Sequence, residues 1–200
     1  MDINTRANQI LQVQQDAVKK LKVTGSIKQA IEKIAIAQQD GRRIITTGMG
    51  KAGIIAKKMS ATLASIGFPS FYVQPAEAAH GDIGRIAPDD IVVVFSNSGR
   101  TGEVVNMIIT LHNVNDSQNY VITIGSNSEP KIPHNLAVSY GKIDESCVVK
   151  KVPSTSTTLM LIIADIIAIT AAESIGLDDD WFKLRHPGGA IGKSYRENDA

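Results

Sequence analysis

The sequence is poor in cysteine, with Cys147 alone among 200 residues. A single thiol cannot form an intramolecular disulfide, so a secreted scaffold held together by disulfides is excluded and a reducing compartment is favoured. We therefore expect a cytoplasmic protein. No base stands beside Cys147 in the sequence to activate its thiol, which predicts a packing role for this side chain rather than a nucleophilic one.

The chain also lacks a long apolar run. Its N-terminus carries Asp2 and no apolar stretch follows, which argues against a cleavable signal peptide. The most apolar segment, residues 159–172, contains Asp165 and is shorter than the roughly 20 residues that a membrane span needs. We predict that this segment forms a buried helix.

Neither sign of charge is in excess, since 21 Lys and Arg stand against 20 Asp and Glu and leave a net charge of +1. The balance gives no electrostatic drive toward nucleic acid or an anionic membrane, so any functional cation must act locally. No repeat or linker divides the sequence. We expect one domain over residues 1–200, with N-terminal helices over about 1–40 and a sheet-and-helix core over 41–193.

Segments with the pattern of strands alternate with segments of helical periodicity. Two helices are predicted first, over residues 3–23 and 27–39, with Ser26 as the N-cap of the second. A long core helix is predicted over residues 154–175. The alternation predicts an α/β fold in which helices cover a five-stranded parallel sheet. The predicted strands cover residues 43–47, 70–73, 90–95, 120–124 and 137–140.

The loop over residues 96–101, Ser-Asn-Ser-Gly-Arg-Thr, lies between a predicted strand and a helix. Ligands of open parallel sheets bind at the carboxyl ends of the strands. Three hydroxyls and a glycine at the start of a helix favour an anion, because the first N–H groups of a helix are free and its dipole is positive there. The loop predicts a phosphate site, although Ser98 or Thr101 would also serve as a simple helix cap.

A second loop, Gly48-Met49-Gly50-Lys51, also joins a strand to a helix, and a lysine in this place can pair with a phosphate or a sugar oxygen. The loop lacks the spacing of a P-loop. The glycines at 48, 50 and 53 match a dinucleotide fingerprint in spacing only. The second strand ends at Val73 without the acidic residue that would hold a ribose, so the sequence disfavours NAD.

Four separated stretches carry glycine-rich or polar motifs. In their order and spacing they resemble the SIS (sugar isomerase) domain of the D-arabinose 5-phosphate isomerases, over about residues 40–193. The third pattern is common to SIS domains, whereas the second and fourth are typical of this branch. The stretches are 48–51 (Gly-Met-Gly-Lys), 75–82 (Pro-Ala-Glu-Ala-Ala-His-Gly-Asp), 96–99 (Ser-Asn-Ser-Gly) and 186–192 (His-Pro-Gly-Gly-Ala-Ile-Gly).

The resemblance implies a three-layer α-β-α sandwich of flavodoxin-like type and a defined reaction. Members of the family interconvert D-ribulose 5-phosphate and D-arabinose 5-phosphate through an enediol, without an organic cofactor. The product supplies Kdo for lipopolysaccharide or capsule. The reaction needs a base near C2, an acid-base partner near the two oxygens, and a cation or donor for the developing negative charge.

Five residues fall on the family's proposed catalytic positions. Glu145 or His186 is expected to take the C2 proton, while Lys51 stabilises charge. His80 is a candidate for ring opening or for proton transfer between the oxygens. Glu103 is expected to position hydroxyls, although an acid in the first turn of a helix is favoured by the dipole alone. Glu145 lies in a polar stretch that would otherwise be read as solvated surface.

The same resemblance implies the phosphate contacts. It requires no metal, yet His80 and His186 near carboxylates are candidates for an inhibitory zinc ion. His112 and His134 lack a surrounding motif and are expected at the surface. The expected phosphate ligands are Ser96, Ser98, Thr101, Ser154 and Thr155, and the expected loop residues are Gly48, Gly50, Asn97 and Gly99.

The chain departs from the family at two points. Ala52 stands where many relatives have serine, which leaves the phosphate to the other hydroxyls. The sequence ends at Ala200 without the pair of CBS domains that follows in most members. We therefore expect a stand-alone isomerase domain, in which any feedback inhibition by CMP-Kdo acts at the active site.

The amphipathic N-terminal helix is expected to pack on the sheet or to join subunits. Members of the family assemble as dimers or tetramers, and residues 176–192, with Trp181, Phe182 and His186, are expected to complete a neighbour's site. Two other functions stay open. One is isomerisation of another phosphosugar, and the other is a non-catalytic SIS module that senses a sugar phosphate. The joint presence of the catalytic candidates favours an enzyme.

Overall fold

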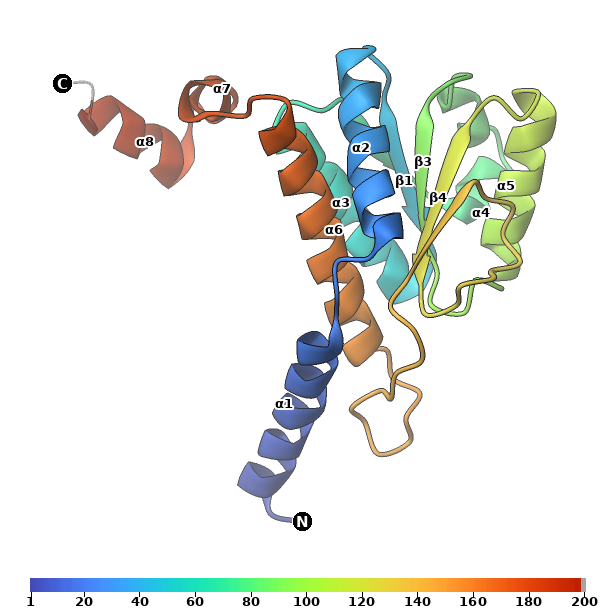
Figure 1. Cartoon of the computed structure of the whole chain (residues 1–200), viewed down its shortest axis with the longest axis vertical. Helices are drawn as coiled ribbons and strands as arrows, with labels where there is room; N and C mark the ends of the chain where they lie inside the picture. The colour runs from blue at the N-terminus through green and yellow to red at the C-terminus, as the bar shows by residue number, and fades with distance from the viewer. Residues whose placement is uncertain (199–200) are drawn as a thin grey trace.

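A computed structural model describes residues 1–198 as a five-stranded parallel sheet with helices on both faces (Figure 1). The predicted three-layer α/β sandwich is confirmed. The strands are β1 (Ile44–Gly48), β2 (Ser70–Val73), β3 (Ile91–Phe95), β4 (Tyr120–Gly125) and β5 (Leu136–Ser139). The helices are α1 (Ile3–Lys20), α2 (Gly25–Gln39), α3 (Gly50–Ser65), α4 (Pro75–Ala78), the 3₁₀ turn η1 (Asp82–Arg85), α5 (Gly102–Val114), α6 (Thr155–Ser174), α7 (Asp179–Arg185) and α8 (Gly189–Asn198).

The order of the strands places two loops side by side. The sheet runs β2-β1-β3-β4-β5, so β1 and β3 are neighbours although β2 separates them in sequence. Every residue of β1 and β3 is buried, which explains the continuous apolar sequence of β3. The two strands pair in register up to Gly48 and Phe95. Their following loops therefore meet at the carboxyl edge of the sheet, where parallel sheets hold ligands.

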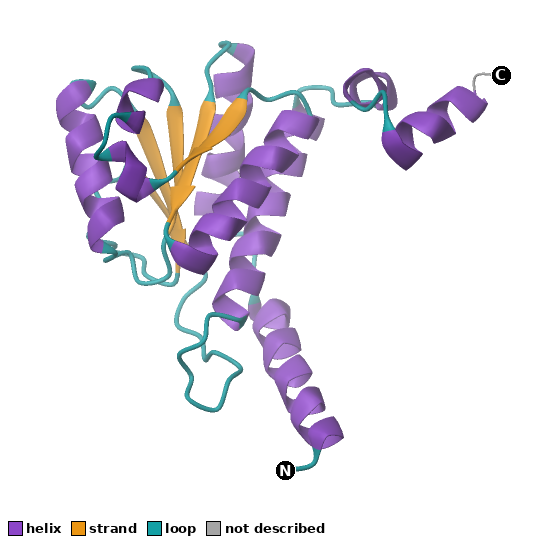
Figure 2. Cartoon of the chain, turned by 180° about the vertical axis from the view of Figure 1, so that it is seen from behind, coloured by secondary structure: helices purple, strands orange, loops and turns teal. Residues whose placement is uncertain are grey.

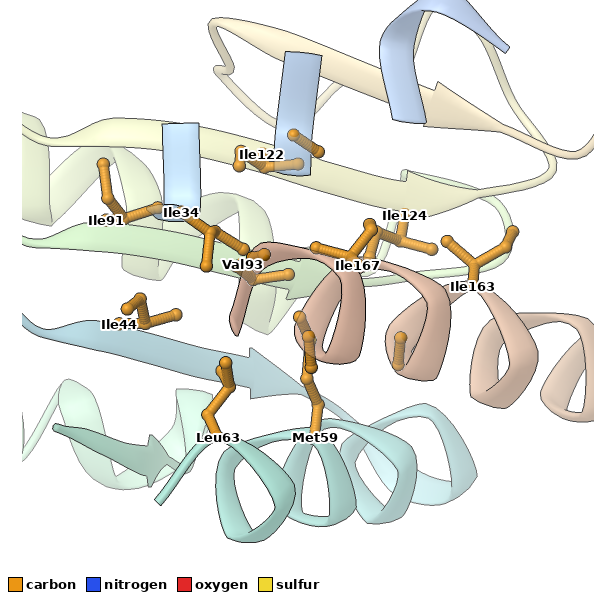
Figure 3. Close-up of a cluster of buried hydrophobic side chains, with 14 of the residues drawn as sticks. Ile34, Ile44, Met59, Leu63, Ile91, Val93, Ile122, Ile124, Ile163 and Ile167 are labelled. Carbon is orange, nitrogen blue, oxygen red and sulfur yellow. The ribbon is translucent and has the colours of Figure 1, made fainter. Parts of the chain in front are cut away.

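Alternate residues of each strand pack into two separate hydrophobic cores, one on each face of the sheet. Ile44 and Val93 point toward α2, α3 and α6, whereas Ile45 and Val92 point toward α4 and α5. Figure 2 shows the helices of both layers against the sheet. The larger core is drawn in Figure 3, where Ile34 from α2, Met59 and Leu63 from α3, and Ile163 and Ile167 from α6 meet the sheet.

Helix α6 is the predicted buried helix. By length and composition it would pass as a membrane span, with a mean hydropathy of 1.8, yet 56% of that window is buried within the fold. It packs against both α2 and α3. Its charged residue, Asp165, forms an ion pair with Lys58 of α3. The prediction of a core helix is confirmed.

The helices at the two ends of the chain extend away from the sheet (Figure 1). Helix α1 has no buried residue and is tied to the core by Arg6, which donates to the Ser146 carbonyl at 2.6 Å. Helix α7 is tied by Trp181, whose indole N–H donates to the Ile66 carbonyl at 2.9 Å. Helix α1 ends at Lys20, three residues before the predicted limit.

The predicted cap of α2 was wrong. Thr24, not Ser26, occupies the N-cap, and its hydroxyl accepts from the N–H of Ile27. The two hydroxyls lie 2.9 Å apart and either residue type can cap a helix, so local sequence could not separate them.

A buried carboxylate fixes the amino ends of β1 and β3. Asp90 is 4% exposed and accepts from Arg43 Nε at 3.1 Å, from Arg43 Nη2 at 2.6 Å and from the backbone N–H of Ala87 at 2.8 Å. We expect Asp90→Ala to lower the free energy of unfolding by about 2–3 kcal/mol, because hydrogen bonds to charged groups are lost and donors stay buried. Urea denaturation measures the change.

The matched control is Asp40→Ala, since Asp40 pairs with Arg42 at 3.4 Å while both side chains are more than two-fifths exposed. Exposed pairs contribute about 0–1 kcal/mol, so the control should change stability little. Equal losses for the two variants would contradict the assignment.

Candidate functional site

A cavity of about 470 Å³ opens at the carboxyl ends of β1 and β3. The loop after β1 leads into α3 on one face of the sheet, and the loop after β3 leads into α5 on the other, so a crevice forms between them. The start of α6 closes the third side. The lining residues are Met49, Gly50, Lys51, Ala52, Phe95, Ser96, Asn97, Ser98, Thr101, Pro153, Ser156, Thr157 and Met160.

The loop from β3 to α5 is held in shape by its own hydroxyls. Ser96 Oγ accepts from the N–H of Gly99 at 3.2 Å and lies 3.2 Å from Thr101 Oγ1. Ser98 Oγ accepts from the N–H of Arg100. Thr101 occupies the N-cap position of α5, but its side chain makes no capping bond to the helix. The simple capping role is therefore excluded, and the positive end of α5 is open to an anion.

Two glycines have conformations or contacts that a side chain would disturb. Gly99 has φ +65°, and an added Cβ would lie 2.3 Å from Pro130 Cβ. At Gly48 a Cβ would lie 2.7 Å from the Phe95 carbonyl oxygen. The Gly48 carbonyl accepts from the Tyr72 hydroxyl at 2.7 Å. Both loops are thus anchored to neighbouring elements.

Lys51 stands in the first turn of α3 with its side chain on the cavity wall. Among the side chains of residues 1–195, no carboxylate forms an ion pair with its ammonium. An unpaired lysine beside an uncapped helix start gives this cavity two sources of positive potential. The cavity is suited to a phosphorylated or otherwise anionic ligand.

Glu145 reaches the cavity wall indirectly. Its Oε2 accepts from the N–H groups of Ser154 at 2.8 Å and Ser156 at 3.2 Å, and the Ser156 hydroxyl donates to Oε1. Burial raises the pKa of this carboxyl, but the hydrogen bonds from Ser156 and Ser154 outweigh burial and hold the pKa below its ordinary value. Glu145 is therefore a carboxylate at neutral pH.

Tyr140, which sequence analysis did not single out, lies between Glu145 and the loop from β3 to α5. Burial, and then the charge of Glu145, raise the pKa of the Tyr140 phenol above its ordinary value. The hydroxyl stays protonated and donates to Asn97 Oδ1 at 2.6 Å. This contact fixes the amide of Asn97, so its Nδ2 is left to serve as a donor at the cavity wall.

His186 is oriented by Phe182 at the end of α7. The rings stack with centroids 3.8 Å apart, and His186 Nδ1 lies 2.9 Å from the Phe182 carbonyl oxygen. A carbonyl only accepts, so Nδ1 carries a proton and Nε2 is free to act as a base in the neutral ring. His186 lines another cavity, between α7 and α8, and not the cavity around Lys51.

Two further catalytic candidates also lie outside the main cavity. Glu103 lines a smaller cavity of about 170 Å³ between α4 and α5. His80 is exposed just after α4, and its backbone N–H donates to the Glu77 carbonyl. Among the residues that the structure describes, no three His, Cys, Asp or Glu side chains gather as a metal site. The roles of Glu103 and His80 stay predictions.

The hydroxyl residues at the start of α6 do not all line the cavity. Ser156 and Thr157 line the cavity, whereas Ser154 and Thr155 do not. Thr155 is 1% exposed, and its hydroxyl has no partner within the described chain. The sequence indicated a site through the run of hydroxyl residues. Which of these residues face the cavity depends on their angular position around α6. The phosphate role of Ser154 and Thr155 stays a prediction.

Cys147 differs from the expected packing residue. It is partly exposed, and its Sγ accepts from the N–H groups of Lys151 and Val152 at 3.2 Å. The hydrogen bond from Val152 is the main cause that holds the pKa of the thiol below its ordinary value. The thiol organises a turn and does not fill the core.

Comparison with known protein families gives a match over most of the chain. The SIS domain matches residues 36–170. The arabinose 5-phosphate isomerase KdsD of Pseudomonas aeruginosa is 41% identical over 155 residues, which are 76% of this chain and 46% of that protein. The chain spans about half the length of the curated relatives that it matches.

Two solved structures are similar over nearly the whole chain. One, from Bacteroides fragilis NCTC 9343 and described as a phosphosugar isomerase involved in capsule formation, is 32% identical with a TM-score of 0.89, and the match covers 94% of this chain and 99% of that one. The other, an Escherichia coli CFT073 protein in complex with arabinose 5-phosphate, is 30% identical with a TM-score of 0.83, and the match covers 94% and 100%.

Proposed function

The chain belongs to the SIS domain family, and from that membership we propose that it interconverts D-ribulose 5-phosphate and D-arabinose 5-phosphate through an enediol. The main support is the geometry of the main cavity. It places Lys51, which forms no ion pair with the side chains that the structure describes, beside the uncapped start of α5. The relatives named as arabinose 5-phosphate isomerases and the solved complex with arabinose 5-phosphate support this choice of substrate.

The phosphate binds to the loop from β3 to α5. Ser96, Ser98 and Thr101 carry hydroxyls on the cavity wall, and the first N–H groups of α5 add donors with a favourable dipole. Gly99 lets this loop pass beneath Pro130. Lys51, across the cavity, is then near the sugar oxygens, where it stabilises the charge that develops on the enediolate.

Proton transfer needs one group that removes hydrogen from C2 and returns it to C1, and a second that moves a proton between O2 and O1. Glu145 and His186 are the candidates for the C2 proton. Glu145 is a carboxylate bound to Ser156 of the cavity wall, and His186 presents a free Nε2. His80 is the candidate for ring opening, and Glu103 orients hydroxyls. No organic cofactor or metal takes part, although zinc held by His80 and His186 would inhibit.

A second copy of the chain completes the site. His186 follows α7, outside the cavity of its own chain, and α7 extends from the core (Figure 1). Large apolar side chains on both end segments face solvent, among them Leu11 at 54% and Leu184 at 80% exposure. Such surfaces favour association. We therefore assign a homodimer or homotetramer in which residues 176–192 reach a neighbour's cavity.

The proposed location is the cytoplasm, where the reaction would supply the precursor of Kdo for lipopolysaccharide or capsule. Inhibition by CMP-Kdo at the active site is part of this proposal. It is tested by titrating CMP-Kdo against substrate, and an inhibitor that neither binds nor competes with substrate refutes it.

The expected result for the purified chain is turnover of D-arabinose 5-phosphate with kcat/KM on the order of 10⁴ M⁻¹s⁻¹ or more. Fructose 6-phosphate and sedoheptulose 7-phosphate should react at least about 100-fold more slowly, because the extra carbons must fit the same cavity. A coupled assay that detects the isomerised sugar measures each rate.

Two outcomes identify the other functions. Preference for a longer phosphosugar would make the chain a different isomerase. Binding of arabinose 5-phosphate without turnover would make it a sensor of sugar phosphates.

A further inference from the structure

The N-terminus of α6 is already occupied by a carboxylate of the same chain. Its N-cap residue, Ser154, makes no capping bond of its own to the helix. Glu145 takes that place, because its Oε2 accepts the N–H groups of Ser154 at 2.8 Å and Ser156 at 3.2 Å. Negative charge is favoured at a helix N-terminus. The anion that α6 attracts is therefore supplied by the protein.

The hydroxyls of the two serines are also committed to Glu145. Ser154 Oγ donates to Glu145 Oε2 at 3.1 Å and accepts from the N–H and hydroxyl of Ser146 at 3.1 and 2.9 Å. Ser156, 1% exposed, donates its hydroxyl to Glu145 Oε1. A hydroxyl has one proton, so neither serine can donate to a phosphate without releasing Glu145.

The start of α5 differs in this respect, since no side-chain capping bond is made there and Glu103, in its first turn, lines another cavity. We propose that Ser154 and Ser156 are positioning residues that hold Glu145 beside the cavity wall, and that their hydroxyls do not bind the substrate's phosphate. This inference rests on the proposed function for the identity of the substrate.

The arrangement couples Glu145 to several charged or titratable groups. Tyr140 faces it from the end of β5, and Arg6 of α1 binds the Ser146 carbonyl next to it. Asp144, its neighbour in the chain, is paired with Lys150 at 3.0 Å. Among the hydrogen bonds that lower the pKa of Glu145, the Ser156 hydroxyl is the largest cause. Removal of the Ser156 hydroxyl should raise the pKa of Glu145, so the carboxylate becomes protonated at a higher pH.

The test separates positioning from phosphate binding by the kinetic constant that changes. We expect Ser156→Ala to lower kcat about tenfold, with KM and the inhibition constant of inorganic phosphate within about twofold of the wild type, and to move the acidic limb of the kcat profile to higher pH. Ser156→Thr, which keeps the hydroxyl, should restore kcat and the position of the acidic limb. The matched control is Ser98→Ala, which should raise KM and the phosphate inhibition constant together.

A Ser156→Ala variant that weakens phosphate inhibition as Ser98→Ala does, with an unmoved acidic limb, overturns the proposal. A second readout does not need turnover. The carboxyl carbon of Glu145, followed by ¹³C NMR in glutamate-labelled protein, should titrate at higher pH in Ser156→Ala. Ser154→Ala provides the same measurement if Ser156→Ala fails to fold.

A wild-type chain without isomerase activity, combined with the expected NMR shift, refutes the proposed function and leaves the positioning of Glu145 intact. An unchanged titration in both folded variants refutes the positioning, whatever the activity.

Discussion

Mixing two inactive variants of this chain should restore isomerase activity. Lys51→Met removes the cation of the main cavity, and His186→Gln removes the base at the end of α7, so each alone is expected to lose about 10³-fold in kcat. If one chain supplies the cavity and its partner supplies His186, random pairing of subunits rebuilds about a quarter of all sites, which is about half of the sites in the mixed dimers alone. Co-expression with two affinity tags, tandem purification and the coupled assay measure the recovery.

The geometry explains why complementation should work. His186 lines the cavity between α7 and α8 and not the cavity around Lys51, and α7 extends from the core. The control mixes Lys51→Met with Glu145→Gln. Because Glu145 is held by the same chain's Ser154 and Ser156, that mixture contains no intact site and should stay inactive. A fully active His186→Gln variant, or a mixed sample with no recovery, would contradict the shared site.

Gly99→Ala should weaken phosphate binding, with a loss of about 100-fold in kcat/KM that appears mainly in KM. Two effects combine at this position. Gly99 has φ +65°, which costs an alanine about 1–2 kcal/mol. The new Cβ would also meet Pro130 Cβ at 2.3 Å, so the loop that presents Ser96 and Ser98 must move. Steady-state kinetics and phosphate titration measure the loss.

Gly41→Ala separates strain from displacement of the loop. Gly41 has φ +70°, but nothing lies within 4 Å of a Cβ added there. In urea denaturation, Gly41→Ala should lower the free energy of unfolding by about as much as the positive φ alone costs at Gly99. Its KM should not change. A Gly99→Ala variant that is no worse than Gly41→Ala in binding would show that contact with Pro130 does not shape the site.

The fold was predictable because its signals are local. Residues 91–95 are apolar throughout, as a strand buried on both faces must be, and the sequence before α5 offers hydroxyls and glycine at the point where ligands of parallel sheets bind. These patterns predicted the sheet, the buried α6 and the position of the loop after β3, while phosphate binding by that loop stays a prediction. The choice between Thr24 and Ser26 as a cap was not predictable, because both residues satisfy the same local rule.

The site required information that no local pattern carries. The motifs that contain His80 and His186 resemble the family as clearly as the loop around Lys51 does, yet the fold places neither histidine on the main cavity. Glu145 had the composition of surface sequence, but the segment after β5 folds back and sets its carboxylate on the start of α6. Contacts of this kind join residues through the path of the chain, which periodicity does not encode.

The sequence by itself therefore determined the layers of the fold and the positions of its loops, because hydrophobic period and the chemistry of helix starts act over a few residues. Only the tertiary structure decided that Ser156 lines the cavity while Thr155 does not, that Glu145 occupies the start of α6, and that the start of α5 is open. The reason is that burial and the occupation of a helix N-terminus depend on packing between distant segments.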